Sequence, residues 1–287
     1  MRVADYVMRF VAGLGAKHVF VLTGGGAMHL NDALARCPDL QFVCNHHEQA
    51  CAIAAENYAK ATTNFGVAMV TTGPGGTNAM TGLAGAWLDS TPVLFISGQV
   101  KRADRMYRPD GSALGVRQRG PQELDIVSLV RPITKYAVTI EDPLSIRYHL
   151  EKAAYLARHG RPGPVWLDIP LDVQASPIDE SSLRAFDVRE LEISRPEGAI
   201  AAAVSEIIER LNSAERPLVF AGHGVRLAGA ETAFQQLIRL LNIPVATTWL
   251  VMDLLDEGDP LFAGRPGTVA PRGANFALQN CDFLLTI

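Results

Sequence analysis

Residues 42–60, FVCNHHEQACAIAAENYAK, decide the fold of this 287-residue chain. The first three residues are apolar and predict a buried strand. Glu48 then opens a stretch in which small apolar residues recur at helical spacing, which predicts a helix able to pack closely against a neighbour. In open α/β sheets ligands bind beyond the carboxyl ends of the strands, so a carboxylate at this junction is a candidate functional group.

Strands and helices alternate on both sides of this segment. Upstream we expect a helix over 4–13, a strand over 19–22 and a second helix from about residue 29. Downstream the expected elements are strand 66–71, helix 79–88, strand 93–96, helix 143–158 and strand 165–169. Short turns between alternating strands and helices predict an α/β fold, with a mostly parallel sheet covered by helices on both faces.

The length of the chain favours two domains. The first is expected over 1–173, and the polar, aperiodic segment 174–197 is expected to be a linker. From residue 198 a second α/β unit follows, with expected strands at 217–221, 245–248 and 283–287. Three strands would form an incomplete Rossmann-like domain with a poorly covered edge, so we expect the native polypeptide to continue beyond residue 287.

Composition excludes several classes of partner and site. Since 26 basic residues stand against 30 acidic ones, we expect neither nucleic acid nor an anionic membrane as a partner. No apolar stretch approaches the ~18 residues of a membrane span, and the chain leads at once into an amphipathic helix without a signal peptide, which favours the cytoplasm. Neither the four unpaired cysteines nor the adjacent His46 and His47 predict a metal site.

Two glycine-rich turns follow predicted strands. The first is TGGG at 23–26, and the second is TGPGGTN at 72–78. Glycine lets the backbone approach a ligand closely and aim free N–H groups at it, although either turn could equally be a permissive connection. Asn78, at the end of the second turn, is expected to cap the following helix.

The first glycine turn also supports an alternative function. Gly24 and Gly26 form GxG after a strand, and Glu48 lies 22 residues beyond Gly26, about where dinucleotide-binding folds keep the acid that holds a ribose. His29, however, occupies the position of the third glycine, where helix and strand should pack closely. A nicotinamide-dinucleotide-binding oxidoreductase therefore stays open as an alternative.

Taken in order, these motifs resemble the pyrimidine-binding domain of thiamine diphosphate enzymes, and within that group the acetolactate synthase branch. The resemblance is carried by HHEQA at 46–50, the strand at 67–70 and TTGPGGTNAMTGLAGAWLDSTPVLFISGQV at 71–100. It covers most of residues 1–175 and continues more weakly to 287. It implies a pyrimidine-binding domain over 1–173 and part of the central domain over 198–287.

The resemblance implies a transferase that decarboxylates pyruvate and passes the two-carbon unit to a second carbonyl compound. Glu48 matches the glutamate that hydrogen-bonds the cofactor's aminopyrimidine, which in its imino form removes the thiazolium proton. Gln122 and Gly25 match residues that contact substrate-derived oxygens. The residues that match the thiamine-binding turns are Thr23, Gly24, Gly25, Thr72, Gly73, Pro74 and Asn78.

Three further expectations come from the same family. Flavin-containing members contact FAD through residues that match Gly222, Gly224, Thr247, Thr248, Gly264, Gly267 and Thr268, although many flavin-free relatives share the fold. Members hold Mg²⁺ and the diphosphate through a Gly-Asp-Gly stretch that does not occur in this chain, so the resemblance places the metal in a domain outside it. Because the family's active site lies at a subunit interface, we expect a homodimer or homotetramer.

The chain departs from acetolactate synthases in the loop at 98–121. This loop is longer than theirs, and PQELD at 121–125 replaces a Phe-Gln-Glu-Thr-Asp stretch, which leaves the acceptor substrate open. Arg102, Arg105 and Arg117 in this region are candidates for binding a carboxylate or a phosphate. Without a diphosphate-binding half the chain alone is expected to be inactive. A non-catalytic half-protein of a split thiamine enzyme stays open as a second alternative.

Overall fold

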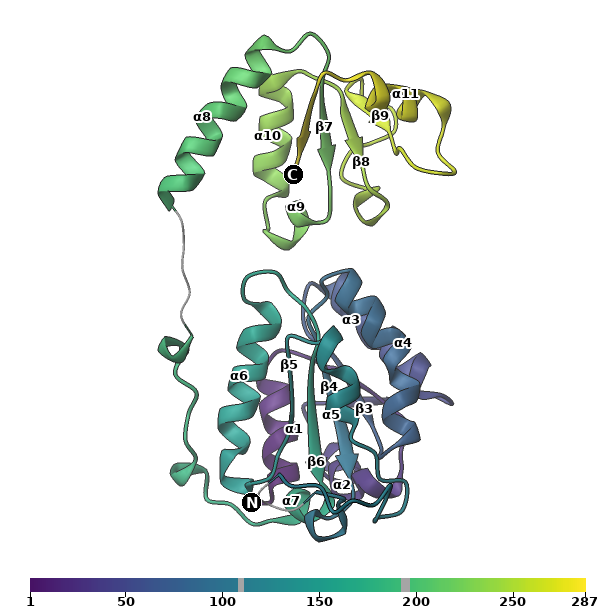
Figure 1. Cartoon of the computed structure of the whole chain (residues 1–287), viewed down its shortest axis with the longest axis vertical. Coiled ribbons are helices and arrows are strands. Elements are labelled where there is room, and N and C mark those ends of the chain that lie inside the picture. Colours follow the sequence, from purple (N-terminus) through teal and green to yellow (C-terminus); the bar gives the residue numbers. More distant parts are fainter. Residues whose placement is uncertain (108–110, 192–196) are drawn as a thin grey trace. The chain divides into compact units, whose positions relative to one another are not determined.

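A computed structural model describes residues 1–107, 111–191 and 197–287 (Figure 1). The chain divides into two compact units, Met1–Leu191 and Glu192–Ile287, and each has its own sheet and core. Parts of the basic loop and of the expected linker, residues 108–110 and 192–196, lie outside the described residues.

The first unit is built on a six-stranded sheet with the strand order β2-β1-β3-β4-β6-β5, in which every pair is parallel. The strands are β1 His18–Val21, β2 Gln41–Cys44, β3 Gly66–Val70, β4 Val93–Gln99, β5 Tyr136–Thr139 and β6 Val165–Pro170. Strands β3, β4 and β6 are buried along their whole length, as expected of parallel strands covered on both faces. The predicted parallel α/β fold is confirmed.

Helices cover the two faces of this sheet (Figure 1). One face packs against α1 Val3–Gly13, α2 Met28–Arg36, α6 Ile146–Arg158 and α7 Leu171–Ala175, and the other against α3 Glu48–Thr62, α4 Pro74–Leu88 and α5 Ile126–Val130. Successive residues of β3 alternate between the two cores, with Met69 in the first and Val70 in the second. Short 3₁₀ turns join these elements, among them η1 Gly25–Ala27 and η2 Arg102–Asp104.

The prediction of a buried strand at Phe42 to Cys44 is wrong. All four residues of β2 are exposed, and Phe42 exposes 53% of its surface. The strand lies at the edge of the sheet and pairs only with β1, so its apolar side chains are not covered within the described chain. The period of an apolar run predicts a strand, but it does not reveal whether that strand is central or at an edge.

Helix α4 begins at Pro74, five residues before the start that the sequence predicted at 79. Gly73, with φ of 59°, is the N-cap, and Pro74 follows in the first helical position, where the missing N–H costs nothing. Most of the second glycine turn is therefore helix. Asn78 lies within α4, so its predicted capping role is wrong.

The second unit contains a four-stranded parallel sheet in the order β10-β7-β8-β9. Its strands are β7 Pro217–Ala221, β8 Val245–Thr247, β9 Phe262–Gly264 and β10 Phe283–Thr286, and its helices are α8 Glu197–Ser213, α9 Gly224–Leu227, α10 Glu231–Leu241 and α11 Arg272–Asn280. The prediction of three strands missed β9. This strand has three residues and ends at a glycine with φ of 97°, which gives almost no periodic signal.

The segment that follows α7 returns to the first unit. The Ile178 N–H donates to the carbonyl of Met1 at 2.8 Å, and the Val3 N–H donates to the carbonyl of Ser176 at 3.0 Å. The side chains of Ile178 and Leu183 are buried in the core that α1 and α6 share. These contacts make residues 176–183 part of the first unit.

Candidate active site

Glu48 is the first residue of α3, directly beyond the carboxyl end of β2. His47 is the N-cap, and its Nδ1 accepts a hydrogen bond from the Gln49 N–H at 3.1 Å. This histidine therefore caps the N-terminus of α3. The Glu48 side chain is buried, with 8% of its surface exposed. The partial positive charge of the helix N-terminus favours a carboxylate at this position.

The two oxygens of the Glu48 carboxylate have different surroundings. Asn78 of α4 donates a hydrogen bond from Nδ2 to Oε2 at 2.9 Å. On the other side lies Gly75, where a Cβ atom would stand 3.4 Å from Oε1 and 2.8 Å from the Thr71 methyl group. Within the described residues no group donates to Oε1. The site thus holds one oxygen in place and presents the other to a space that glycine keeps open.

The two glycine turns lie against each other beside this carboxylate. The Gly26 N–H donates to Oγ1 of Thr71 at 3.1 Å, and the Thr72 hydroxyl donates to the carbonyl of Gly98 at 3.1 Å. A Cβ at Gly26 would stand 1.8 Å from Oγ1 of Thr72, so only glycine allows this approach. Thr23 and Gly25 are exposed at the rim of the same turn.

Gln122 reaches this end of the sheet through its backbone. It has a left-handed conformation with φ of 60°, and a Cβ at Gly73 would stand 2.0 Å from its carbonyl oxygen. The side chain of Gln122 is exposed. The residues predicted for the first unit, from both glycine turns, Glu48, Pro74, Asn78 and Gln122, therefore gather at one end of one sheet.

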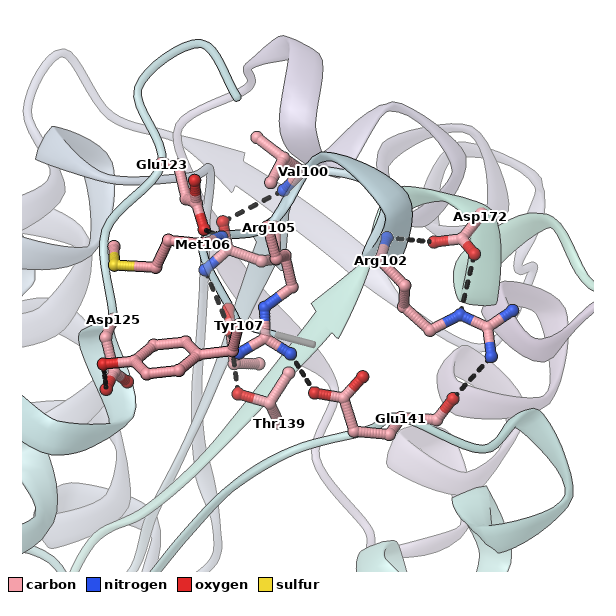
Figure 2. A network of polar contacts seen from close by, with 12 residues as sticks. Val100, Arg102, Arg105, Met106, Tyr107, Glu123, Asp125, Thr139, Glu141 and Asp172 are labelled. Carbon is pink, nitrogen blue, oxygen red and sulfur yellow. Dashed lines mark hydrogen bonds and ion pairs between the residues drawn. The ribbon is translucent and has the colours of Figure 1, made fainter. Parts of the chain in front are cut away.

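Two of the three arginines expected to bind an anion are engaged within the protein (Figure 2). Arg102 forms an ion pair with Asp172 at 2.7 Å and donates to the carbonyl of Glu141 at 2.7 Å. Arg105 is buried and pairs with the Glu141 carboxylate. Arg102 and Arg105 therefore form ion pairs within the protein, whereas Arg117 is exposed.

Asp168 is a buried carboxylate that the sequence analysis missed. It lies in β6 with 1% of its surface exposed, and it accepts hydrogen bonds from Ser97 at 2.6 Å, Gln99 at 3.1 Å and Thr139 at 3.2 Å. Burial raises the pKa of this carboxyl to about 6, and the three hydrogen bonds oppose that rise. The signal in the sequence is a single acid within the apolar strand VWLDIP.

In the second unit, the residues predicted for a flavin lie near the carboxyl ends of β7, β8 and β9. Among the described residues, the hydroxyl groups of Thr247 and Thr248 are buried without a hydrogen-bond partner, and so is Nε of Arg265. Gly264 and Arg265 line a pocket of about 370 Å³ together with Trp249, Glu257, Phe262, Val269, Ala270 and Pro271. Arg265 lines this pocket and carries one of these buried polar atoms, whereas Thr247 and Thr248 are not among the lining residues.

The remaining flavin candidates are placed by backbone contacts. The Gly222 N–H donates to the carbonyl of Ile287 at 2.8 Å, and Gly224 opens the short helix α9. The side chain of Asn275 both accepts from the Gly267 N–H at 2.9 Å and donates to its carbonyl at 3.0 Å, which fixes the exposed turn before Thr268. Asn275 and Arg265 were not predicted, since neither belongs to a recognisable sequence motif.

Two other kinds of site are absent from residues 1–107, 111–191 and 197–287. No helix there combines the length and the apolar character that crossing a bilayer requires. The same residues contain no group of three or more histidine, cysteine, aspartate or glutamate side chains arranged to hold a metal ion.

Comparison with known proteins identifies both units. Residues 1–129 match the family described as thiamine pyrophosphate enzyme, N-terminal TPP binding domain, and residues 204–287 match thiamine pyrophosphate enzyme, central domain. The chain is 35% identical to an acetolactate synthase of Arthrospira platensis over 279 residues, which cover 95% of this chain and 46% of that protein.

Two other relatives give the same result. An acetolactate synthase large subunit of Lactococcus lactis is 34% identical over 99% of this chain and 47% of its own length. A probable acetolactate synthase large subunit of Methanocaldococcus jannaschii is 33% identical over 100% of this chain and 47% of its own length. The chain thus spans about half the length of these curated relatives.

Proposed function

The chain belongs to the thiamine pyrophosphate enzymes, and we propose that it forms the amino-terminal portion of an acetolactate synthase-like carboligase. In this proposal residues 1–173 bind the pyrimidine half of thiamine diphosphate. The complete protein decarboxylates pyruvate and transfers the two-carbon unit to a second carbonyl compound. The observation that carries the proposal is the buried Glu48 carboxylate, held by Asn78 at one oxygen and open at the other.

The residues around Glu48 fit the pyrimidine half of the cofactor. When bound, thiamine diphosphate supplies a carbon that attacks a keto acid and then accepts the electrons released by decarboxylation. Oε1 of Glu48 would accept a hydrogen bond from a ring nitrogen and hold the proton there. Gly75 leaves room for a flat ring, because any side chain at this position would approach both Oε1 and Thr71. In a buried site such a hydrogen bond is stronger than it would be in water.

The substrate side of the site would be formed by Gln122 and the first glycine turn. The exposed amide of Gln122 and the backbone around Gly25 can both donate hydrogen bonds to substrate oxygens. Arg102 and Arg105 form ion pairs with Asp172 and Glu141, so we do not assign the binding of substrate oxygens to these arginines. The second carbonyl compound stays open, because PQELD at 121–125 differs from the acetolactate synthase pattern.

We place Mg²⁺ and the diphosphate on a further part of the complete protein. The relatives are about twice as long as this chain, and the chain contains no Gly-Asp-Gly stretch. The chain on its own is therefore expected not to turn over pyruvate. If instead the native protein proves to be a species of 31.0 kDa, the half-protein alternative is favoured.

FAD is proposed for the second unit. The unpaired hydroxyls of Thr247 and Thr248 and Nε of Arg265 support a ligand rich in hydrogen-bonding groups beside the pocket of about 370 Å³. The purified complete protein should release a fluorescent flavin when it is denatured. A protein that is active and releases no flavin would contradict this assignment.

We further propose that two copies of the protein complete the site together. Phe42 and Val43 of the edge strand β2 and Ile53 of α3 expose apolar side chains, and an open strand edge with exposed apolar side chains is typical of an interface. Phe42→Glu should shift the complete protein to a smaller species in analytical ultracentrifugation and lower its activity. The control Leu240→Glu, at a position 82% exposed in the second unit, should do neither.

The main experiment is an assay of the complete protein with thiamine diphosphate, Mg²⁺ and pyruvate. The proposal predicts release of carbon dioxide that depends on the cofactor, together with a product two carbons longer than the acceptor. An NADH titration tests the nicotinamide alternative, for which fluorescence should rise. A correctly assembled protein that binds NADH and leaves pyruvate unchanged would overturn the proposed function.

A further inference from the structure

The buried carboxylate of Asp168 is connected to the loop that presents Gln122. Gln99, the last residue of β4, donates from Nε2 to Oδ2 of Asp168 at 3.1 Å and to the carbonyl of Leu124 at 2.9 Å. Its Oε1 accepts from the Val100 N–H at 3.0 Å. These three contacts leave one orientation for the amide, with the nitrogen toward Asp168 and Leu124.

The segment that Gln99 reaches is itself tightly organised. The buried carboxylate of Glu123 accepts a hydrogen bond from the Met106 N–H (Figure 2). It also accepts from the backbone N–H groups of Arg119 at 2.9 Å and Gly120 at 3.1 Å. Glu123 thereby connects the early part of the loop, at Met106, with its end, at Arg119 and Gly120. The returning limb, residues 120–125, is hydrogen-bonded to the end of the sheet through Gln99, which donates to the carbonyl of Leu124.

The same limb touches the turn that begins α4. A Cβ on Gly73 would stand 2.0 Å from the carbonyl oxygen of Gln122, and both residues have positive φ angles. Five residues beyond Gly73, Asn78 donates to Glu48. A continuous series of contacts therefore runs from Asp168 through Gln99 and the limb to the Glu48–Asn78 pair.

A purely structural role does not account for this arrangement. Burying a carboxylate costs free energy, and apolar residues of similar volume often stabilise a core at least as well. Asp168 is nevertheless placed among the fully buried residues of β4 and β6, where it accepts from Gln99. What the polar pair supplies is a fixed direction for the Gln99 amide, and thereby a fixed place for Leu124.

We propose that Gln99, oriented by Asp168, is a positioning residue that holds the limb 120–125 against the Gly73 turn and so fixes Gln122 relative to Glu48. Neither residue touches the reacting atoms in this account. The proposal rests on the proposed function only for the roles of Gln122 and Glu48. The statement that Gln99 holds residues 120–125 in place does not depend on the proposed function.

An exchange of the two side chains isolates the contact between Gln99 and Leu124. In Gln99→Glu with Asp168→Asn, the new amide at 168 can donate to the new carboxylate at 99, which still accepts from the Val100 N–H. The carbonyl of Leu124, however, loses its donor. Asp168→Asn alone can keep its amide oxygen toward Nε2 of Gln99 and turn its nitrogen toward the Ser97 hydroxyl, so it should leave Gln99 in place and serves as the matched control for the exchanged pair.

The decisive readout is hydrogen–deuterium exchange of the backbone. In the exchanged pair, amides within 118–126 should exchange at least about tenfold faster than in the wild type, whereas β6 stays protected. Unchanged exchange in 118–126 would overturn the proposal. If the exchanged pair does not fold, Gln99→Met, which keeps the length of the side chain and removes the donor, gives the same test with the same two outcomes.

Kinetics separate this proposal from the proposed function. In the exchanged pair kcat for pyruvate should fall at least about tenfold while the affinity for thiamine diphosphate stays unchanged, because only the substrate side moves. Equal losses in both quantities would indicate a general structural defect and contradict positioning. A wild type without any activity on pyruvate would refute the proposed function, yet the exchange experiment would still decide whether Gln99 holds the limb.

Discussion

At the scale of single residues, the environment of Glu48 is asymmetric. Oε2 accepts from Asn78 at 2.9 Å, while Oε1 faces the space beside Gly75. This asymmetry suits a carboxylate that must bind a ligand through one oxygen without changing its own orientation. Asn78 is then an orienting residue, a role that its sequence position at the end of a glycine turn did not reveal.

Asn78→Ala should lower the activity of the complete protein without unfolding it. A hydrogen bond to a charged group contributes ~1.5–3 kcal/mol, so the loss should be roughly ten- to hundredfold in kcat/KM. The matched control is Asn57→Ala on the exposed side of α3, where Nδ2 only donates to the carbonyl of Ile53. Activity of Asn78→Ala within about twofold of the wild type would show that Glu48 needs no orienting partner.

Asp168 should give the first unit a distinct pH dependence. Because burial raises its pKa from 3.8 to about 6, the native state binds this proton more tightly than the unfolded state does. The stability that Asp168 contributes is therefore fully present below pH 3.8 and is lost as the pH rises through about 6. This loss amounts to about 3 kcal/mol, at 1.36 kcal/mol per pKa unit.

Urea denaturation of wild type and Asp168→Asn between pH 4 and 8 measures this effect. At pH 4 both side chains are neutral, and each can accept from Gln99 and Thr139 at one oxygen, so the two proteins should have similar stability. Relative to Asp168→Asn, the wild type should lose roughly 2–3 kcal/mol of stability toward pH 8. A difference that stays constant with pH would mean that the pKa of Asp168 is not raised.

At the scale of elements, the site depends on how closely α3 and α4 pack. Gly82 of α4 lies against Ala52 of α3, and a Cβ at Gly82 would stand 2.5 Å from the Ala52 Cβ. The small residues at helical spacing in α3 predicted such a close neighbour, and the structure identifies it as α4. Since Glu48 and Asn78 come from these two helices, their separation is set by this packing.

Gly82→Ala should therefore destabilise the protein, although alanine normally favours a helix. Overpacking of a core costs ~1–3 kcal/mol, which exceeds the gain of up to ~1 kcal/mol in helix propensity. Gly13→Ala at the end of α1, where a Cβ would meet nothing within 4 Å, is the control and should be neutral or slightly stabilising. Equal urea midpoints for the two variants would show that α3 and α4 have room to separate.

The elements themselves were largely predictable, and the misses have physical causes. Hydrophobic periodicity located most helices and strands of the first unit, because a parallel sheet buries continuous apolar runs, but it missed the short elements β5, α5 and α7. Periodicity carries no information about edges, so β2 was expected to be buried. It also cannot place a helix start within a glycine turn, where Pro74 rather than Asn78 begins α4. The strand β9 is too short to leave a pattern.

At the scale of the whole molecule, the boundary between the two units can be tested directly. Ile178 and Leu183 are 7% and 5% exposed within the first core, and each buried side chain of this size contributes ~1.5–3 kcal/mol. A fragment of residues 1–191 should therefore unfold cooperatively and be about 3–6 kcal/mol more stable than a fragment of residues 1–173. Identical urea midpoints would place the boundary near residue 173, as the loss of periodicity suggests.

The sequence predicted the site residues that belong to the glycine turns. It did not predict the residues whose roles depend on buried contacts between distant segments. Glycines and threonines in TGGG and TTGPGG stand out in the sequence, and the structure brings both turns together. Asp168, Arg265 and Asn275 are isolated polar residues whose importance depends on contacts with distant segments. Periodicity and local motifs cannot reveal such contacts, because they arise only when the sheet places the strand ends side by side.

The most direct measurement of the central claim follows the proton that Glu48 is proposed to help remove. The complete protein, loaded with thiamine diphosphate and Mg²⁺, is transferred to D₂O and quenched in acid, and NMR gives the rate at which the thiazolium carbon exchanges its hydrogen. The account predicts that Glu48→Gln slows this exchange roughly 10²–10⁴-fold relative to the wild type, with the cofactor still bound. An exchange rate in Glu48→Gln equal to that of the wild type would contradict it.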